Sequence, residues 1–134
     1  MAIRIVRLGE PRERDEGLRL GTVRRPPRGV PKTEFASRDF YDVWLPNLSP
    51  SAELVALALK AAAEEDRAAW KGFVGKYRKE MASPDASHLL GLLAALSKQT
   101  NFSVGCYCAD EAWCHRSALR DMLMEKGADI VAPP

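Results

Sequence analysis

The sequence predicts an α/β fold: a single three-layer domain whose short, mostly parallel sheet carries helices on both faces, as in Rossmann-like proteins. First, short apolar segments alternate with helical ones in the order β, β, β, α, α, α, β, α, β. Second, a chain of 134 residues is long enough to bury one core, so residues 1–134 are expected to form one domain. Third, 46% hydrophobic and 28% charged residues are typical of a globular protein.

The first part of the chain contains three predicted strands. Residues 2–7 and 18–24 show the apolar alternation of half-buried strands, and residues 40–45 form an apolar run that Pro46 stops. Between the last two, residues 24–32 contain three prolines and a glycine, which predict an ordered loop. The alternating positions of the second strand are Leu18, Leu20 and Thr22.

Three helices are predicted next. Ser49 as N-cap and Pro50 at the first helical position begin the first helix, and Ser83-Pro84-Asp85 begins the third. Residues at helical spacing predict an apolar stripe on each helix, which we expect to be buried. These stripes are Leu54, Val55, Ala58 and Ala62; Trp70, Phe73, Val74, Tyr77 and Met81; and Leu89, Leu90, Leu93 and Leu96.

The last part of the chain contains two more strands and a helix. Residues 102–107 form a short apolar strand, and residues 114–126 form an amphipathic helix that Gly127 ends. The closing run D-I-V-A-P-P, residues 129–134, is predicted to be a short strand.

The segment C-Y-C-A-D-E-A-W-C-H-R, residues 106–116, is the strongest candidate for a functional site. It contains all three cysteines, one of the two histidines and an arginine. It also joins the strand of residues 102–107 to the helix of residues 114–126, and α/β sheets bind ligands outside the carboxyl ends of their strands. We therefore expect the chemistry of this protein here.

The leading hypothesis is a small enzyme that acts on an anionic substrate containing phosphate or sulfur. Cys114 would be the nucleophile or redox thiol, because the first turn of a helix lowers the pKa of a cysteine. His115, on the inward face of the helix, would orient or activate it. Arg116, on the more exposed side, would bind the anion together with Arg24 or Arg25.

Other interpretations of the cysteine segment stay open. Cys106 or Cys108 could supply a second, resolving thiol, and Cys106 on a strand could equally be a packed core residue. Cys106, Cys108, Cys114 and His115 also form a possible ligand set for zinc or iron in a metal-binding or ligand-sensing module without catalysis. Their C-x-C-x5-C-H spacing differs from the usual paired C-x2-C knuckles. His115 could instead be a buried histidine that hydrogen-bonds to the backbone.

A third hypothesis is a nucleic-acid accessory protein that binds through the basic loop of Arg24, Arg25, Arg28 and Lys32. The net charge of +2 is too small to favour this partner over a solvated loop. The sequence contains no Gly-rich phosphate loop and no other signature that would name a cofactor.

The location expected from the sequence is the cytoplasm. No apolar run approaches the roughly 20 residues of a membrane span, and the N-terminus lacks the apolar region of a signal peptide. An odd number of cysteines, three, excludes complete disulfide pairing within one chain and agrees with a reducing compartment.

Several motifs together resemble one known family. They are T-V-R-R-P-P at residues 22–27, D-V-W-L-P at 42–46, W-K-G-F-V-G-K-Y-R-K-E-M at 70–81, and Cys106, Tyr107, Cys114, His115 and Arg116. This set, which extends over nearly the whole chain, resembles domain of unknown function 488, a bacterial family that includes the YeaO-like proteins. The resemblance implies a compact α/β fold and no established reaction. Many relatives have an acidic residue at the position of Cys108, which weakens a four-ligand metal site across the family.

Overall fold

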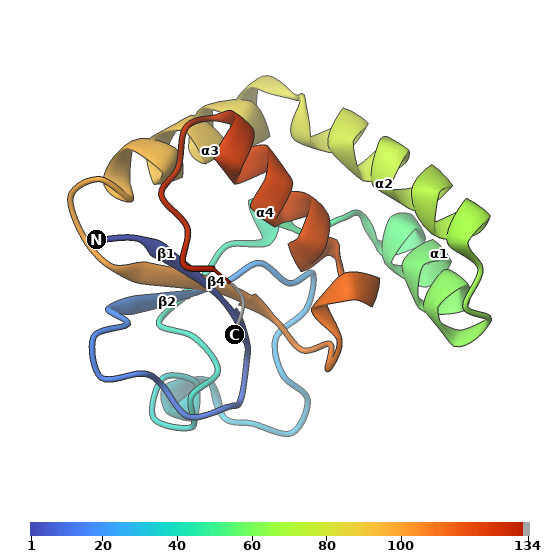
Figure 1. The fold of residues 1–134 in the computed structure, drawn as a ribbon. Coiled ribbons are helices and arrows are strands. Elements are labelled where there is room, and N and C mark those ends of the chain that lie inside the picture. The colour runs from blue at the N-terminus through green and yellow to red at the C-terminus, as the bar shows by residue number, and fades with distance from the viewer. Residues whose placement is uncertain (133–134) are drawn as a thin grey trace.

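The computed structural model describes residues 1–132 and contains one four-stranded parallel sheet. Its strands are β1 (Ile3–Arg7), β2 (Leu18–Gly21), β3 (Val43–Trp44) and β4 (Phe102–Cys106). They lie in the order β1-β4-β2-β3, so that β4, distant in sequence, pairs with both β1 and β2 (Figure 1). The carboxyl ends of β2 and β4 therefore meet at one edge, where Gly21 lies opposite Gly105.

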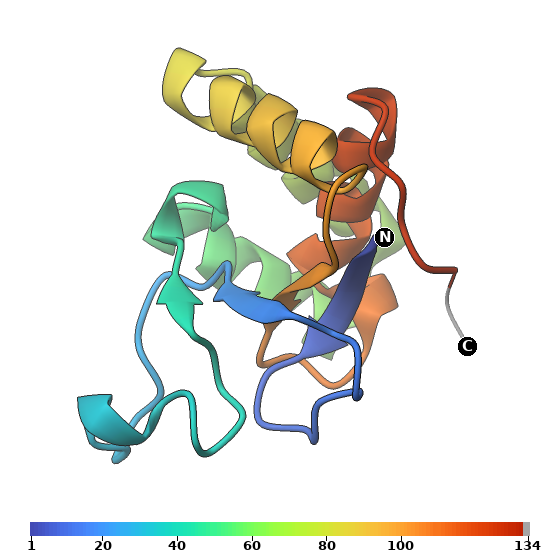
Figure 2. The ribbon, with the colours of Figure 1, turned by 90° about the vertical axis from the view of Figure 1, so that its left-hand side faces the viewer.

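Four α-helices pack together on one face of this sheet: α1 (Ala52–Ala63), α2 (Arg67–Met81), α3 (Pro84–Leu96) and α4 (His115–Glu125) (Figures 1 and 2). The predicted α/β class with a parallel sheet is confirmed. The third layer, on the opposite face, consists of loops and the 3-10 helix η1 (Lys32–Glu34) and contains no α-helix. The two connections that form it carry four prolines, which disfavour α-helix in their interiors.

The core joins the sheet to the helix stripes. Ile3, Leu20, Phe102 and Val104 contribute the sheet side. The stripe of α2 is buried as predicted, with Val74 packed against the same cluster. Leu96 is an exception, since 38% of its surface is exposed: α3 turns the face of Ala86, Leu90 and Leu93 inward, and Leu96 projects from its last turn.

Four predicted boundaries need correction. The second strand, predicted over residues 18–24, ends at Gly21. The N-cap of α1 is Ser51 and not Ser49, because the Ser51 hydroxyl accepts a hydrogen bond from the backbone N–H of Leu54. The third strand contains only Val43 and Trp44, since the residues before it form a loop. The final strand is reduced to a single bridge between Ile3 and Ile130, and residues 133–134 lie outside the described part of the chain.

The face of the sheet away from the helices holds a buried ion pair. The Arg19 guanidinium lies 2.7 Å from the Glu16 carboxylate, which also accepts a hydrogen bond of 2.7 Å from the Ser103 hydroxyl. Arg19 donates further hydrogen bonds to the carbonyls of Glu10 and Asp39. These contacts attach both loops to the strands they cover. Within residues 1–132, no helix combines the length and apolar character needed to cross a bilayer.

Candidate functional site

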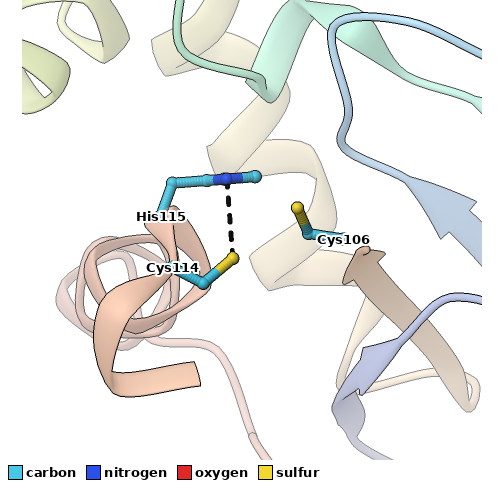
Figure 3. A group of neighbouring side chains, drawn as sticks. All are labelled: Cys106, Cys114 and His115. Carbon is cyan, nitrogen blue, oxygen red and sulfur yellow. Dashed lines mark hydrogen bonds between the residues drawn. The ribbon is translucent and has the colours of Figure 1, made fainter. Parts of the chain in front are cut away.

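The site forms where β4 ends and α4 begins. Cys106 is the last residue of β4, and Cys114 is the N-cap of α4. The chain between them turns back through the 3-10 helix η3 (Glu111–Trp113), which begins where the Asp110 carboxylate accepts a hydrogen bond from the N–H of Ala112. This turn brings Cys114 and His115 beside Cys106, so that the two sulfurs and an imidazole nitrogen lie within 4.8 Å of one another (Figure 3).

Thr22, just beyond β2, contacts the imidazole of His115 from the sheet side. Its hydroxyl oxygen lies 3.0 Å from the carbonyl of Gly105, to which it can donate, and 3.2 Å from Nε2 of His115. With the hydroxyl hydrogen on the Gly105 carbonyl, the oxygen accepts from Nε2 and the neutral ring carries its proton on Nε2. Nδ1, 3.8 Å from the sulfur of Cys114, is left with a free lone pair.

Tyr77 of α2 holds the other side of the imidazole. Its ring meets that of His115 edge-on, with centroids 5.6 Å apart, and its hydroxyl donates a 2.6 Å hydrogen bond to the carbonyl of Leu48. His115 is thus confined between the sheet and α2, and its only described hydrogen-bonding partners are Thr22 and Cys114.

Arg116 is buried, and the prediction that it lies on the more exposed side is wrong. Only 3% of its surface is exposed. Its guanidinium donates to the sulfur of Cys114 at 3.4 Å and to the carbonyl of Cys108 at 2.6 Å. The loop of residues 107–113 folds back over the start of α4 and covers the arginine. Helical periodicity does not predict this burial, because the covering residues lie outside the helix. Arg116 therefore acts directly on the thiol group.

The third cysteine, Cys108, also joins the cluster: its sulfur lies 3.9 Å from that of Cys106, although it is outside the tight group with His115. All three are free thiols. Hydrogen bonding from Cys106 lowers the pKa of Cys108, to about 3, and lowers the pKa of Cys114. The pKa of Cys106 rises, because it is the donor to both and is itself buried. The lowest pKa of the three is therefore that of Cys108, whose thiolate is stabilised by hydrogen bonds from Cys106 and Cys114 and by the charge of Arg116.

A cavity of about 960 Å³ opens beside the cluster, with Cys106, Cys108, Cys114 and His115 in its lining. Arg24 and Arg25, predicted to lie over the same cleft if β2 neighbours β4, both line it. Arg116 does not; it lines a second, smaller cavity of about 470 Å³ whose lining includes none of the three cysteines. The structure therefore separates the three arginines assigned to one anion site.

Arg24 and Arg25 also differ from each other. The guanidinium of Arg24 donates to the carbonyls of Ser49 and Pro50, at 2.9 and 3.0 Å, and so ties the end of β2 to the start of α1. Arg25 is exposed, and its backbone carbonyl accepts a 2.9 Å hydrogen bond from the hydroxyl of Tyr107. Only Arg25 of this pair has a guanidinium that points to solvent without a hydrogen bond among the described residues.

Two residues of the site were missed by the sequence prediction. Thr22 continues the alternation of the second strand and is a polar residue at its carboxyl end, where α/β sheets bind ligands. Its position in the sequence could therefore have identified it as a site residue. Tyr77 was assigned to the core stripe of α2, which is correct, but nothing in the sequence shows that the same ring contacts His115.

Comparison with family models agrees with the resemblance seen in the sequence motifs. The model described as the active DUF488-N3 subclade matches residues 3–127. Searches of curated proteins and of solved structures found no match. The match includes every strand of the sheet and every residue of the thiol and imidazole cluster. The chain therefore belongs to the family of domain of unknown function 488, in its N3 subclade.

Proposed function

We propose that this protein is a thiol-dependent enzyme acting on a small anionic substrate, with Cys114 as the nucleophile. One observation carries the proposal: the sulfur of Cys114 lies between Nδ1 of His115, at 3.8 Å, and the Arg116 guanidinium, at 3.4 Å. A base and a fixed cation on one thiol are the usual means of activating cysteine. Cys114 itself is 1% exposed, so substrate would reach it through the cavity that it lines.

The reaction class this geometry supports is group transfer through a thioester- or thiophosphate-like bond. Cys114 gives its proton to Nδ1 of His115, and the sulfur attacks an electrophilic carbon or phosphorus atom of the substrate. The leaving group departs with its electron pair and takes the proton from Nδ1. Water then attacks the same atom and gives a proton to Nδ1, and the electron pair of the broken bond returns to sulfur.

Alkylation by iodoacetamide as a function of pH, after chelator treatment and with the modified site mapped by mass spectrometry, tests this proposal. Cys114 should react at neutral pH as a thiolate, and Arg116→Gln should shift its reactivity to higher pH while Arg116→Lys shifts it less. Cys106→Ser is the matched control for loss of a neighbouring sulfur. An apparent pKa near 8.5 or above for Cys114, or labelling confined to Cys108, would contradict the assignment.

A second candidate function, a metal-binding module, is favoured by the convergence of three ligand atoms. Cys106, Cys114 and one nitrogen of His115 lie within 4.8 Å of one another and are all buried. Two sulfurs and one imidazole form a known ligand set for zinc, which leaves one position for water or substrate. A metal-bound histidine uses one ring nitrogen as the ligand and donates the N–H of the other to a neighbouring acceptor. In this protein Nδ1 would be the ligand and Nε2–H would donate to the Thr22 hydroxyl.

Elemental analysis of freshly purified protein separates the two candidates. One equivalent of zinc or iron that is lost in Cys114→Ser and retained in Cys108→Ser would support the metal module with three ligands. Zinc and iron far below one equivalent, with full thiol reactivity, would remove it. An equivalent metal content in His115→Gln and the unmodified protein would also count against this site.

A further inference from the structure

We infer that the cavity beside the cluster binds an organic anion with an apolar body, whose anionic group is held by Arg25 and Arg28. This inference rests on the proposed function and adds to it the chemical class of the substrate. It also replaces Arg116 and Arg24, whose guanidinium groups are already bonded to protein atoms, as the groups that recognise charge.

The apolar part of the inference rests on the walls of the cavity. Helix α1 contributes Val55 and Leu59, and the connection between β2 and β3 contributes Pro26, Pro27 and Phe40. Leu59 is 60% exposed, which places a large apolar surface at the cavity with no protein group covering it. Burying such a surface under a ligand is favourable, because it removes apolar area from water. A plain inorganic anion would leave these walls in water.

The charged part rests on the loop that forms one side of the cavity. Arg25 and Arg28 are both exposed and both line it, and within residues 1–132 neither side chain makes a hydrogen bond or ion pair with the protein. None of the described lining residues is Asp or Glu. Two free guanidinium groups beside an apolar surface, with no competing carboxylate, favour an anion that can accept their forked donors.

The volume of the cavity and the residues that line it indicate the size of the ligand and how it would lie. A volume of about 960 Å³ is at the upper end of the range for small-molecule sites, so it admits a ligand of nucleotide or acyl size. The two loop arginines line this space together with Cys108, Cys114 and His115. A ligand with its anionic group on Arg25 and Arg28 would lay its apolar body along α1 and present its reactive end to the cysteines.

A pair of fluorescent probes that differ only in charge tests this inference. We would titrate the protein with 1-anilinonaphthalene-8-sulfonate and with neutral N-phenyl-1-naphthylamine, at fixed ionic strength. The sulfonate should bind at least about tenfold more tightly than its neutral twin. The double variant Arg25→Gln, Arg28→Gln should abolish the difference in affinity between the two probes. Arg38 is exposed and does not line the cavity, so Arg38→Gln should leave the difference unchanged.

The apolar wall and the chemistry are tested separately. Leu59→Ser should weaken the binding of both probes. If the unmodified protein binds the sulfonate as expected while its Cys114 has an apparent pKa near 8.5 or above, only the proposed enzyme is rejected and the binding site stands. Equal affinity for the two probes would overturn the inference, as would no saturable binding of either. Displacement of the sulfonate by equimolar inorganic phosphate would show a simple anion site, and displacement by a single-stranded oligonucleotide at lower concentration would favour nucleic acid.

Discussion

At the scale of single residues, a line of hydrogen-bonding groups joins the sheet to the thiols. It runs from the carbonyl of Gly105 through the Thr22 hydroxyl and the His115 ring to the sulfur of Cys114. The links are coupled, because the hydroxyl has one hydrogen and the neutral imidazole has one proton to place. A threonine that does not touch the sulfur can thus influence the protonation of the nitrogen that faces it.

Thr22→Val should disturb this line without changing the shape of the side chain. Nε2–H loses its acceptor, and a buried donor left unpaired costs about 1–3 kcal/mol, which favours moving the proton to Nδ1. The imidazole then donates to the sulfur of Cys114, and a hydrogen bond to the thiolate lowers the pKa of that thiol. We expect alkylation of Cys114 at neutral pH to be faster by up to about tenfold, the effect of ~1.4 kcal/mol.

Nitrogen NMR of the His115 ring is the direct measurement for this prediction. The unmodified protein should show the Nε2–H tautomer, and Thr22→Val should populate the Nδ1–H form. Thr22→Ser retains the hydroxyl and should behave as the unmodified protein does. An unchanged tautomer in Thr22→Val, with unchanged alkylation, would show that Thr22 only fills space.

At the scale of elements, the turn before β2 determines how that strand meets β4. Gly17 has a φ of +77°, and a Cβ built on it would overlap the backbone carbonyl oxygen of Asn101, just before β4. The residue therefore permits two things that a side chain would prevent: a left-handed backbone and a close approach of two chain segments. Register between Leu18 and Phe102 depends on this approach.

Gly17→Ala should destabilise the protein more than Gly29→Ala does. Both glycines have positive φ, but a Cβ at Gly29 would meet no atom within 4 Å. Gly29→Ala therefore reports the backbone cost alone, about 1 kcal/mol, and any excess at Gly17 measures the overlap with Asn101. Urea unfolding of both variants gives the comparison. Equal losses of unfolding free energy would show that the segment before β4 moves aside freely.

At the scale of the whole molecule, the two faces of the sheet are stabilised by partly different means. The helix face buries the larger apolar cluster, whereas the opposite face combines a smaller apolar cluster that includes Leu8 and Tyr41 with the ion pair of Arg19 and Glu16. Burial by itself would raise the pKa of Glu16, but hydrogen bonds from Arg19 and Ser103 outweigh it and lower that pKa. The attachment of the loop layer is therefore sensitive to acid.

The direction of the Glu16 pKa shift predicts the pH range in which the free energy of unfolding decreases. Since the pKa of Glu16 is lower in the folded protein than the value of about 4.3 in unfolded chains, its contribution is complete above that value. It disappears as the pH falls from there through the folded pKa. Glu16→Gln should cost about 3–5 kcal/mol at pH 7, because the Arg19 charge stays buried without its partner.

Urea unfolding at pH 7 and near pH 3 measures this contribution. The difference between the unmodified protein and Glu16→Gln should shrink at the lower pH. The exposed pair of Arg4 and Asp15, 3.2 Å apart, supplies the control, and Asp15→Asn should change stability by less than about 1 kcal/mol. A loss in Glu16→Gln that does not depend on pH would contradict the proposed origin of the stability.

Much of this architecture is determined by local sequence. The stripe of Trp70, Phe73, Tyr77 and Met81, and the end of the last helix at Gly127, follow from periodicity and backbone preference over a few residues. The motif from Cys106 to Arg116 is also a local feature, and it locates the candidate site because thiols and an imidazole are concentrated within one short segment.

Tertiary structure alone decides what surrounds those groups. It brings Thr22, 93 residues away in sequence, to Nε2 of His115, and it buries Arg116 against Cys114 under a folded-back loop. It also places the four described α-helices on one face of the sheet, and it leaves the side chains of Arg25 and Arg28 in the cavity lining with no partner among residues 1–132. Such contacts depend on strand order and loop paths, which arise from the packing of distant segments and leave no local pattern in the chain.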